Sequence, residues 1–244
     1  KSRLKIMNLF AIGDIHGCLN PLTSLHKKIL SSNKFNVKDD LLVYLGDYID
    51  RGLNSKQVID QIIKLKKKQV KSILLMGNHE EMMIDFLFNK NNNIKDWLDF
   101  GADQTFKSYD IEIVEFIKDG FEEKVINRLR DSLLKKMSND HINFFKSLEL
   151  SFSNEKYLFV HAGIDPKKKL IDQNKKDYLW SRSDDLFDKD FKAEKIIIHG
   201  HTPEQNIIND PYRVNLDTGC YFSGKLSCVC LSDLNDSRIF FNNL

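Results

Sequence analysis

Five short motifs in this sequence carry Asp, Asn and His side chains, the residue types that bind cations and transfer protons. Each motif follows a short run of β-branched or aromatic residues, as a loop does after a buried strand of an α/β protein. Ligands of an open α/β sheet collect beyond the carboxyl ends of its strands, so we expect the five motifs to converge on one site. The motifs are Gly13-Asp14-Ile15-His16-Gly17, Gly46-Asp47, Gly77-Asn78-His79-Glu80, His161-Ala162-Gly163 and His199-Gly200-His201-Thr202.

The donor atoms of these motifs favour a metal centre. Asp14 and His16 lie two residues apart on a predicted turn, so both side chains could reach one cation. The full set offers oxygen and nitrogen donors without sulfur, which suits Mn, Fe, Zn or Co better than copper(I) or an iron–sulfur cluster. Six ligands are too many for one open catalytic centre, whereas two cations that share a carboxylate would use them all, and such pairs promote in-line phosphoryl displacement. The pattern therefore predicts phosphoester hydrolysis, with the candidate ligands Asp14, His16, Asp47, Asn78, His161 and His201.

In order and type, these motifs resemble those of the calcineurin-like metallophosphoesterases, and specifically the phosphoprotein phosphatase (PPP) family in its bacterial Ser/Thr protein phosphatase form. The resemblance rests on Gly-Asp-Ile-His-Gly at 13–17, Gly-Asp-Tyr-Ile-Asp-Arg-Gly at 46–52, Gly-Asn-His-Glu at 77–80, His-Ala-Gly at 161–163 and Gly-His-Thr at 200–202. Five motifs in this order are a specific signal. The resemblance implies an α/β fold, a metallophosphoesterase-like β-sandwich flanked by helices, with a dinuclear centre at one edge.

The resemblance also implies how the ligands divide between the two metals. By motif position, the first metal would be bound by Asp14 and His16, the bridge would be Asp47, and the second metal would be bound by Asn78, His161 and His201. A hydroxide that bridges the metals would attack phosphorus in line, without a covalent enzyme intermediate. The expected cofactors are two divalent metal ions, Mn first, with Fe, Zn or Co as alternatives.

The same resemblance assigns the residues around the metals. His79 would be the general acid that protonates the leaving alkoxide, and Asp50 would hold its imidazole in the required tautomer. Arg51 would clamp two phosphate oxygens with its planar guanidinium. Arg182, in Trp180-Ser181-Arg182, is a second candidate for phosphate binding, with a surface salt bridge as the alternative.

The leading functional prediction is removal of phosphate from phosphoserine or phosphothreonine in proteins. The alternative within the family is symmetrical hydrolysis of diadenosine tetraphosphate, because Asn215-Leu216-Asp217-Thr218-Gly219-Cys220 resembles both compact bacterial protein phosphatases and their dinucleoside-tetraphosphatase relatives. Met76 stands where many PPP members carry arginine before Gly-Asn-His-Glu, which leaves one phosphate or substrate contact in question. A non-catalytic regulator and a nuclease or cyclic-nucleotide phosphodiesterase rank lower, since every ligand candidate is intact and Thr202-Pro203 follows Gly-His.

Hydrophobic patterning predicts the elements that hold these motifs. Strands are expected over 9–12, 41–45, 73–76, 157–160, 196–198, 212–216, 225–231 and 237–241, and helices over 21–30 and 55–68. Ser55 is the predicted N-cap of the second helix. A helical insertion is expected around 81–150, and one metallophosphoesterase domain is expected to occupy residues 1–244.

Composition excludes several classes of protein. The chain has 41% hydrophobic and 30% charged residues, too apolar for disorder and too charged for a membrane bundle. Its formal net charge of +2 argues against a dedicated nucleic-acid binder, so the expected partner is a phosphoprotein or a phosphorylated small molecule, with neither nucleic acid nor membrane. The apolar run at 6–12 is too short for a signal sequence or membrane span, which predicts a cytoplasmic protein.

The remaining polar residues and cysteines are assigned structural roles. His26 and His141 lie outside the motifs and are expected to be hydrogen-bonded core residues. His199 matches no ligand position of the family. The acidic pairs at 39–40 and 184–185 are expected to be turn or cap residues. All four cysteines, at 18, 220, 228 and 230, are expected to be reduced and structural.

Overall fold

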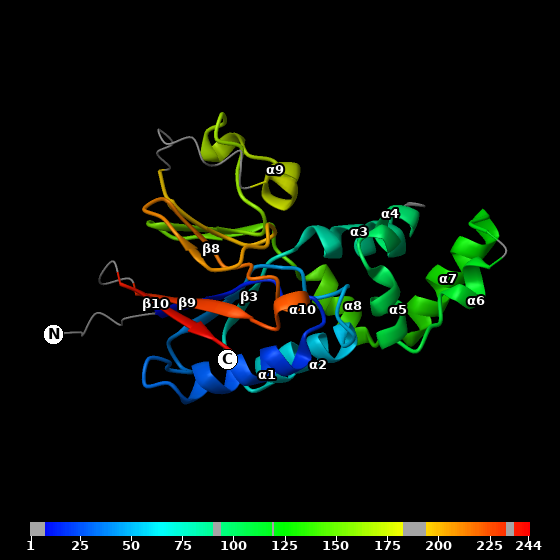
Figure 1. Ribbon diagram of the computed structural model, residues 1–244, viewed down its shortest axis with the longest axis horizontal. Coiled ribbons are helices and arrows are strands. Elements are labelled where there is room, and N and C mark those ends of the chain that lie inside the picture. Colours follow the sequence, from blue (N-terminus) through cyan, green and yellow to red (C-terminus); the bar gives the residue numbers. More distant parts are fainter. Residues whose placement is uncertain (1–7, 90–93, 119, 183–193, 233–236) are drawn as a thin grey trace.

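Two five-stranded sheets pack face to face in the computed structural model, which describes residues 8–89, 94–118, 120–182, 194–232 and 237–244 (Figure 1). Leu9 and Val43 of the first sheet share one apolar cluster with Phe159, Ile198 and Val214 of the second. The predicted α/β sandwich flanked by helices is confirmed. In the described part of the chain no helix is long and apolar enough to cross a membrane.

The first sheet has the strand order β10-β9-β1-β2-β3. Its strands β1, β2 and β3 run parallel to one another, whereas β9 and β10 are antiparallel to their neighbours. Helices α1 and α2 cover its outer face, where their apolar sides pack on β1 and β2. The elements are β1 (Asn8–Ile12), α1 (Leu19–Ser31), β2 (Leu41–Tyr44), α2 (Ser55–Lys67), β3 (Ser72–Leu74), β9 (Ser227–Ser232) and β10 (Arg238–Asn242).

The second sheet has the strand order β4-β5-β6-β8-β7, and α9 packs on its far side (Figure 1). Strands β5, β6 and β8 are parallel. The elements are β4 (Ser151–Ser153), β5 (Tyr157–Val160), η1 (Leu170–Asp172), α9 (Lys175–Trp180), β6 (Ile196–His199), β7 (Ile208–Asn209) and β8 (Arg213–Asn215). The two- and three-residue strands β7 and β4 were not predicted, because segments this short have no readable alternation.

The helical insertion extends away from the sandwich and carries most of the remaining helices (Figure 1). Its helices are α3 (Asn78–Leu87), α4 (Ile94–Asp99), α5 (Ala102–Ser108), α6 (Val114–Ile117), α7 (Glu123–Lys136) and α8 (Asn139–Lys146). Trp97, Phe106 and Leu129 are buried in the core that joins these helices to the first sheet. A further short helix, α10 (Cys220–Ser223), leads into β9.

The polar residues outside the motifs have the expected structural roles, with one exception. His26 lies between the Tyr44 hydroxyl (2.9 Å) and the Gln61 amide (2.8 Å), and His141 is bonded to Tyr109 and Asp60. The predicted capping role of Ser55 is wrong, because α2 has the residue before it as its N-cap. The Ser55 hydroxyl instead accepts a hydrogen bond from the backbone N–H of Asp50.

The acidic pair at 39–40 also behaves as predicted. The Asp40 carboxylate accepts the backbone N–H groups of Asn8 and Asn36, both at 2.8 Å, and the Asp39 carboxylate accepts the side-chain amide of Asn36. These bonds close the turn before β2. The second pair, Asp184 and Asp185, lies outside the described residues.

Candidate metal centre

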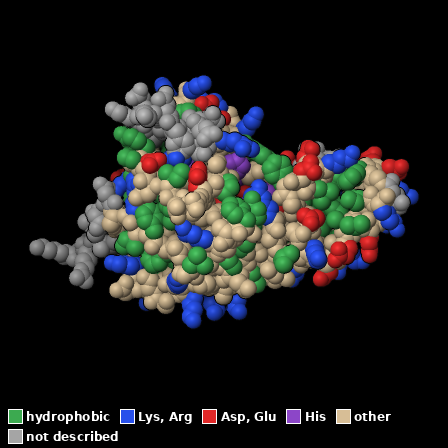
Figure 2. Space-filling view, viewed as in Figure 1, with side chains coloured by type: hydrophobic (Ala, Val, Ile, Leu, Met, Phe, Trp, Pro, Cys, Tyr) green, Lys and Arg blue, Asp and Glu red, His purple; other side chains and the backbone are tan. Residues whose placement is uncertain are grey.

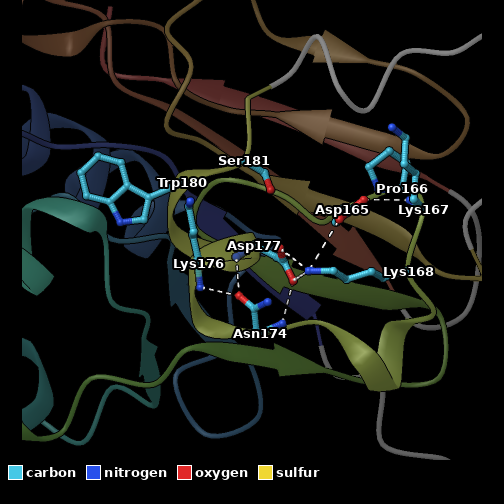
Figure 3. Close-up of a pocket in the computed structure, with 9 residues that line it drawn as sticks. All are labelled: Asp165, Pro166, Lys167, Lys168, Asn174, Lys176, Asp177, Trp180 and Ser181. Atoms are coloured by element: carbon cyan, nitrogen blue, oxygen red, sulfur yellow. Dashed lines mark hydrogen bonds and ion pairs between the residues drawn. The ribbon is translucent and has the colours of Figure 1, made fainter.

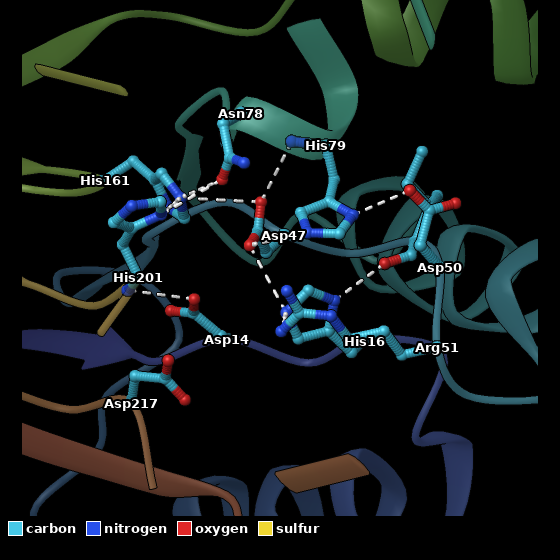
Figure 4. Close-up of polar contacts among 12 residues, drawn as sticks. Asp14, His16, Asp47, Asp50, Arg51, Asn78, His79, His161, His201 and Asp217 are labelled. Atoms are coloured by element: carbon cyan, nitrogen blue, oxygen red, sulfur yellow. Dashed lines mark hydrogen bonds and ion pairs between the residues drawn. The ribbon is translucent and has the colours of Figure 1, made fainter. Parts of the chain in front are cut away.

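The five motifs converge because they follow β1, β2, β3, β5 and β6, whose carboxyl ends meet at one edge of the sandwich. All six candidate ligands reach this edge, with Asp47 between two sets of side chains (Figure 4). Histidine side chains are visible from outside in a hollow near the middle of the face shown in Figure 2, with Lys and Arg side chains beside them. The edge is therefore accessible to a substrate.

Asp47 belongs to two groups of candidate ligands at once. One group comprises Asp47 with His16 and His79, and the other comprises Asp47 with His161 and His201. Its Oδ2 atom lies 3.3 Å from His16 Nε2 and 3.8 Å from His79 Nε2. Its Oδ1 atom lies 3.5 Å from His161 Nε2. The two oxygens of one carboxylate thus face the two groups, an arrangement that suits a ligand shared by two cations.

The second group closes around the side-chain oxygen of Asn78. His161 Nε2 lies 2.9 Å and His201 Nδ1 lies 3.1 Å from Asn78 Oδ1, and the two imidazole nitrogens are 3.2 Å apart. Asp14 also contacts this group, because its Oδ2 accepts a hydrogen bond from the backbone N–H of His201 at 2.9 Å. Three donor atoms that converge this closely fit the coordination sphere of one cation.

Backbone carbonyls fix which ring nitrogen of two histidines faces the centre. His16 Nδ1 donates to the carbonyl of Ile49 and His161 Nδ1 donates to that of Leu45, both at 2.9 Å. A carbonyl only accepts, so each Nδ1 carries the proton and each Nε2 presents its lone pair to Asp47 and its neighbours. This is the outer hydrogen bond that metal-binding histidines usually make.

Buried polar atoms without a hydrogen-bond partner support the same conclusion. Within the described residues these include Asp14 Oδ1 and His79 Nε2, which lie at the centre. Asp14 and His79 are at most 2% exposed, so leaving these atoms unpaired costs free energy unless another group is bound there. The donor set and its unpaired atoms fit divalent cations.

The electrostatics of the centre depend on burial and on these same neighbours. Burial would raise the pKa of Asp47, but His161, His79 and His16 outweigh it and hold that pKa well below its ordinary value. Burial raises the pKa of Asp14, and the neighbouring carboxylates of Asp217 and Asp47 raise it further. A bound cation would relieve this repulsion between carboxylates.

The backbone of the loops is strained where it positions these side chains. Of seven non-glycine residues with positive φ in the described chain, five lie at the site: His16 (45°), Asp47 (51°), Asp50 (69°), Arg51 (65°) and His201 (68°). Such conformations are unfavourable for residues with a Cβ and concentrate at functional sites. Close packing adds a second constraint, because a Cβ at position 77 would collide with Asp47 Oδ1 and one at position 200 with Asp14 Oδ1.

The pair His79 and Asp50 lies beside the first group. Asp50 Oδ2 accepts from His79 Nδ1 at 2.7 Å and from the indole N–H of Trp97 at 2.7 Å. Its Oδ1 accepts the hydroxyl of Thr105 at 2.5 Å. Both donors come from the helical insertion, Trp97 from α4 and Thr105 from α5. Trp97 and Thr105 lie far from Asp50 in the sequence, so no local sequence pattern marked them as its hydrogen-bond partners.

The arginines lie on different sides of the centre. Arg51 Nη1 donates to His16 Nε2 at 3.1 Å, and its guanidinium lies 4.7 Å from the ring centroid of Tyr221, a cation–π contact. Arg182 is exposed after α9. Burial lowers the pKa of His201 to about 3, and the neighbouring His161 lowers it further. Arg182 comes two residues after Trp180, whose ring lies 6.2 Å from that of His201.

Two buried acids had no predicted role. Asp217 points toward Asp14 (Figure 4), and burial raises its pKa. Glu80 accepts the backbone N–H groups of Gly77, Asp47 and Tyr48, each at 2.9 Å, and so joins the loop after β2 to the start of α3. Glu80 ends the motif Gly77-Asn78-His79-Glu80 and Asp217 lies in the stretch 215–220, and these positions were the only sequence signals for the two acids. His199, in contrast, is buried and belongs to neither of the two groups.

A surface pocket of about 500 Å³ lies beside the centre, between the loop at 165–174 and α9 (Figure 3). Lys168 crosses it to Asp177 at 2.7 Å and to Asp165 at 3.6 Å, so its acidic side chains are already paired. Trp180 lines the pocket and its ring lies 6.2 Å from that of His201. The pocket is thus a neighbour of the centre and not the place of the chemistry.

Comparison with known proteins agrees with this geometry. Residues 7–240 match the family model of the calcineurin-like phosphoesterases, which is almost the whole chain. The chain belongs to the calcineurin-like phosphoesterase family. It is therefore a metal-dependent phosphoesterase of a family that uses divalent metals.

Similar proteins carry two kinds of name. This calcineurin-like phosphoesterase is 29% identical over 239 residues to bis(5'-nucleosyl)-tetraphosphatase PrpE [asymmetrical] of Anoxybacillus flavithermus, covering 89% of this chain and 88% of the relative. It is 30% identical over 230 residues to serine/threonine-protein phosphatase 2 of Escherichia coli, covering 90% and 91%. The expected resemblance to PPP-type phosphatases is confirmed.

Solved structures share the fold of this calcineurin-like phosphoesterase at lower identity. A putative diadenosine tetraphosphatase superposes with a TM-score of 0.62 at 17% identity and covers 96% of this chain and 93% of its own. A Saccharomyces cerevisiae protein serine/threonine phosphatase with similarity to human PP5 gives 0.59 at 16%, covering 97% and 79%. At these identities the likeness concerns the fold alone.

Proposed function

We propose that this enzyme holds two divalent cations, Mn²⁺ first, and hydrolyses phosphoserine and phosphothreonine in proteins. The observation that carries the two-cation centre is the position of Asp47, whose two oxygens face different histidine groups. The first cation would be held by Asp14, His16 and Asp47, and the second by Asp47, Asn78, His161 and His201. Bound there, the cations would supply a water nucleophile at neutral pH and neutralise phosphate charge.

His79 supports a substrate with a poor leaving group. Its Nε2 faces the centre without a hydrogen-bond partner, while Asp50 holds Nδ1 and would stabilise the protonated ring. A serine or threonine alkoxide needs a proton as the P–O bond breaks, whereas a nucleotide phosphate leaves without one. The buried support around His79 is therefore best explained by phosphomonoester hydrolysis, in which His79 is the acid.

The phosphate is proposed to lie against Arg51. The guanidinium is already held over Tyr221 and beside His16, so it could present its fork to two phosphate oxygens at little entropic cost. Arg182, two residues after Trp180 at the rim beside His201, would approach the same phosphate. Its exposed position also suits contact with the chain around a phosphorylated residue.

Hydrolysis of a dinucleoside tetraphosphate is the second candidate. It is favoured by the names of the PrpE relatives, which specify asymmetrical cleavage, whereas the motifs around Asp217 suggested the symmetrical kind. Asymmetrical cleavage of diadenosine tetraphosphate by water gives AMP and ATP, and symmetrical cleavage gives two ADP. The products therefore distinguish the two modes.

A substrate panel tests the proposal. The enzyme is assayed with Mn²⁺ on phosphoserine peptides, phosphothreonine peptides and diadenosine tetraphosphate, each separately. The released phosphate and nucleotides are quantified. We expect phosphate from both peptides, with kcat/KM above that for the dinucleotide. Cleavage of the dinucleotide with no action on either peptide would replace the first candidate by the second.

A further inference from the structure

Arg51, the proposed phosphate clamp, runs from the helical insertion to α10. Its backbone N–H donates to the carbonyl of Gly101 at 3.1 Å. Its Cγ atom would lie 3.1 Å from a Cβ at position 101, so a side chain there would crowd it. At the far end, the guanidinium carbon lies 4.7 Å from the ring centroid of Tyr221. The arginine side chain is thus held between Gly101 and Tyr221.

A further contact of this side chain, to His16, would be lost when a cation binds. Arg51 Nη1 donates to His16 Nε2 at 3.1 Å. Because His16 Nδ1 donates to the carbonyl of Ile49, Nε2 holds the only lone pair available in the plane of the ring. This lone pair can serve Arg51 or a cation, but not both. With the first cation bound, the ring of Tyr221 would remain against the guanidinium after the bond to His16 is gone.

The ring of Tyr221 is itself fixed by its neighbours, although the residue is 40% exposed. It packs edge to face with the rings of His16 and Phe222, at centroid distances of 5.3 Å and 4.9 Å. Phe222 folds back over Gly219, where a Cβ would come within 2.1 Å of its ring. Gly219 has a positive φ of 63°, and its N–H donates to Asp217 Oδ1 at 2.9 Å. The turn before α10 therefore determines where the Tyr221 ring lies.

We propose that Tyr221 is a positioning residue for phosphate binding, because its aromatic face holds the Arg51 guanidinium in the metal-loaded enzyme. This inference rests on the proposed function, in which Arg51 clamps the phosphate. The face of an aromatic ring attracts a guanidinium without accepting its N–H groups in the plane of the fork. The donors of Arg51 therefore stay available for phosphate oxygens. A carboxylate in the same place would bind these donors and repel the phosphate.

Loss of the ring should affect phosphate affinity more than the chemical step. Without Tyr221 the guanidinium gains further rotamers, so fixing it on a phosphate costs more entropy. A half-exposed cation–π contact corresponds to about 3–10-fold in affinity. Because the clamp would bind the phosphate both before and during displacement, KM should rise and kcat should change little.

The test measures binding and catalysis separately. Inorganic phosphate is titrated into Mn²⁺-loaded enzyme by calorimetry, metal content is measured by elemental analysis, and hydrolysis of an aryl phosphate gives kcat and KM. Tyr221→Leu should bind phosphate about 3–10-fold more weakly, with KM raised by a similar factor and the metal content of the wild type. Tyr221→Phe, which keeps the ring, should restore the affinity.

The matched control is Tyr212→Leu. Tyr212 is 39% exposed and lies just before β8, at the end of that strand opposite the edge that carries the centre. This variant should bind phosphate as the wild type does. Equal weakening in the two leucine variants would overturn the proposal, because loss of any exposed tyrosine would then be enough.

A double variant tests whether Tyr221 acts through Arg51. Arg51→Ala combined with Tyr221→Leu should bind phosphate as weakly as Arg51→Ala alone. A further loss in the double variant would overturn the proposal, and so would loss of metal from Tyr221→Leu, which would show an effect through His16. Failure of Tyr221→Phe to restore the affinity would also overturn it.

The single variants separate this inference from the proposed function. If Arg51→Ala weakens phosphate binding and Tyr221→Leu does not, the clamp stands and the role of Tyr221 is wrong. If Arg51→Ala leaves phosphate binding unchanged, the clamp is wrong and the role of Tyr221 falls with it. Because both probes are simple phosphates, neither result depends on whether the enzyme prefers phosphoproteins or dinucleotides.

Discussion

Asp50 Oδ2 lies 2.7 Å from Nδ1 of His79, and both side chains are completely buried. The same oxygen accepts the Trp97 indole and the other oxygen accepts the Thr105 hydroxyl. Trp97 and Thr105 thus hold the carboxylate of Asp50, and the carboxylate holds the His79 imidazole with its Nε2 directed at the centre. Burying a carboxylate and its hydrogen-bonded neighbours costs free energy, so we expect this network to have a measurable effect on turnover.

Changing His79→Asn should reduce turnover of an alkyl phosphate by about 10²–10⁴-fold, the usual contribution of general acid–base catalysis. An aryl phosphate with a good leaving group should lose much less, because it needs little protonation. Steady-state kinetics on both substrates provide the comparison.

The same variant tests whether His79 is a metal ligand or the general acid. His79 Nε2 lies near enough to Asp47 and His16 to be counted among the ligands of one group. An acid can be removed without loss of metal, so His79→Asn should retain two equivalents in elemental analysis. Loss of one equivalent would make His79 a ligand and remove it from the role of acid.

Thr105→Val should act through Asp50. The change removes the hydroxyl that Asp50 Oδ1 accepts and leaves a buried carboxylate oxygen short of a donor, which costs about 1–3 kcal/mol. We expect kcat for an alkyl phosphate to fall by about tenfold with KM unchanged, and Thr105→Ser, which keeps the hydroxyl, to restore it. If the serine variant is as slow as the valine variant, the hydroxyl does not position Asp50.

Asp47→Asn should weaken both metals at once, because one residue contacts both histidine groups. Elemental analysis of the purified variant should show well under two equivalents, and hydrolysis of an aryl phosphate should fall in parallel. Asp50→Asn is the matched control for metal content, since Asp50 is equally buried and belongs to neither group, and it should retain two equivalents. Two full equivalents in Asp47→Asn would contradict the bridging role.

Protonation of His26 should destabilise the fold in acid. Burial lowers its pKa from 6.5 to about 4, so below pH 6.5 the unfolded chain binds a proton that the folded protein does not. Stability therefore falls as pH decreases from 6.5 toward 4, by about 2 kcal/mol at pH 5. The contribution is fully present above pH 6.5.

The control for this effect is His26→Gln, which lacks the titrating group. Urea unfolding of both proteins at pH 7.5 and pH 5 should show that the wild-type advantage over the variant shrinks by that amount. Equal differences at the two pH values would mean that His26 is protonated as readily in the folded protein as in the unfolded chain.

The sequence by itself determined the sheet strands that carry the motifs and the edge at which they meet. The reason is physical: buried parallel strands read as short apolar runs, and their ends must turn into loops on the same side. This pattern placed all six candidate ligands at that edge, namely Asp14, His16, Asp47, Asn78, His161 and His201. The insertion was also readable, because helical periodicity extends over many residues.

Only the tertiary structure decided what surrounds these residues. Trp97 and Thr105 reach Asp50 across the insertion, and nothing in their local sequence marks a hydrogen-bond donor for a buried acid. Ser55 shows the same limit, since its sequence position suited an N-cap whereas its hydroxyl serves Asp50. Local propensity reports on the backbone within a few residues, not on side chains brought from elsewhere.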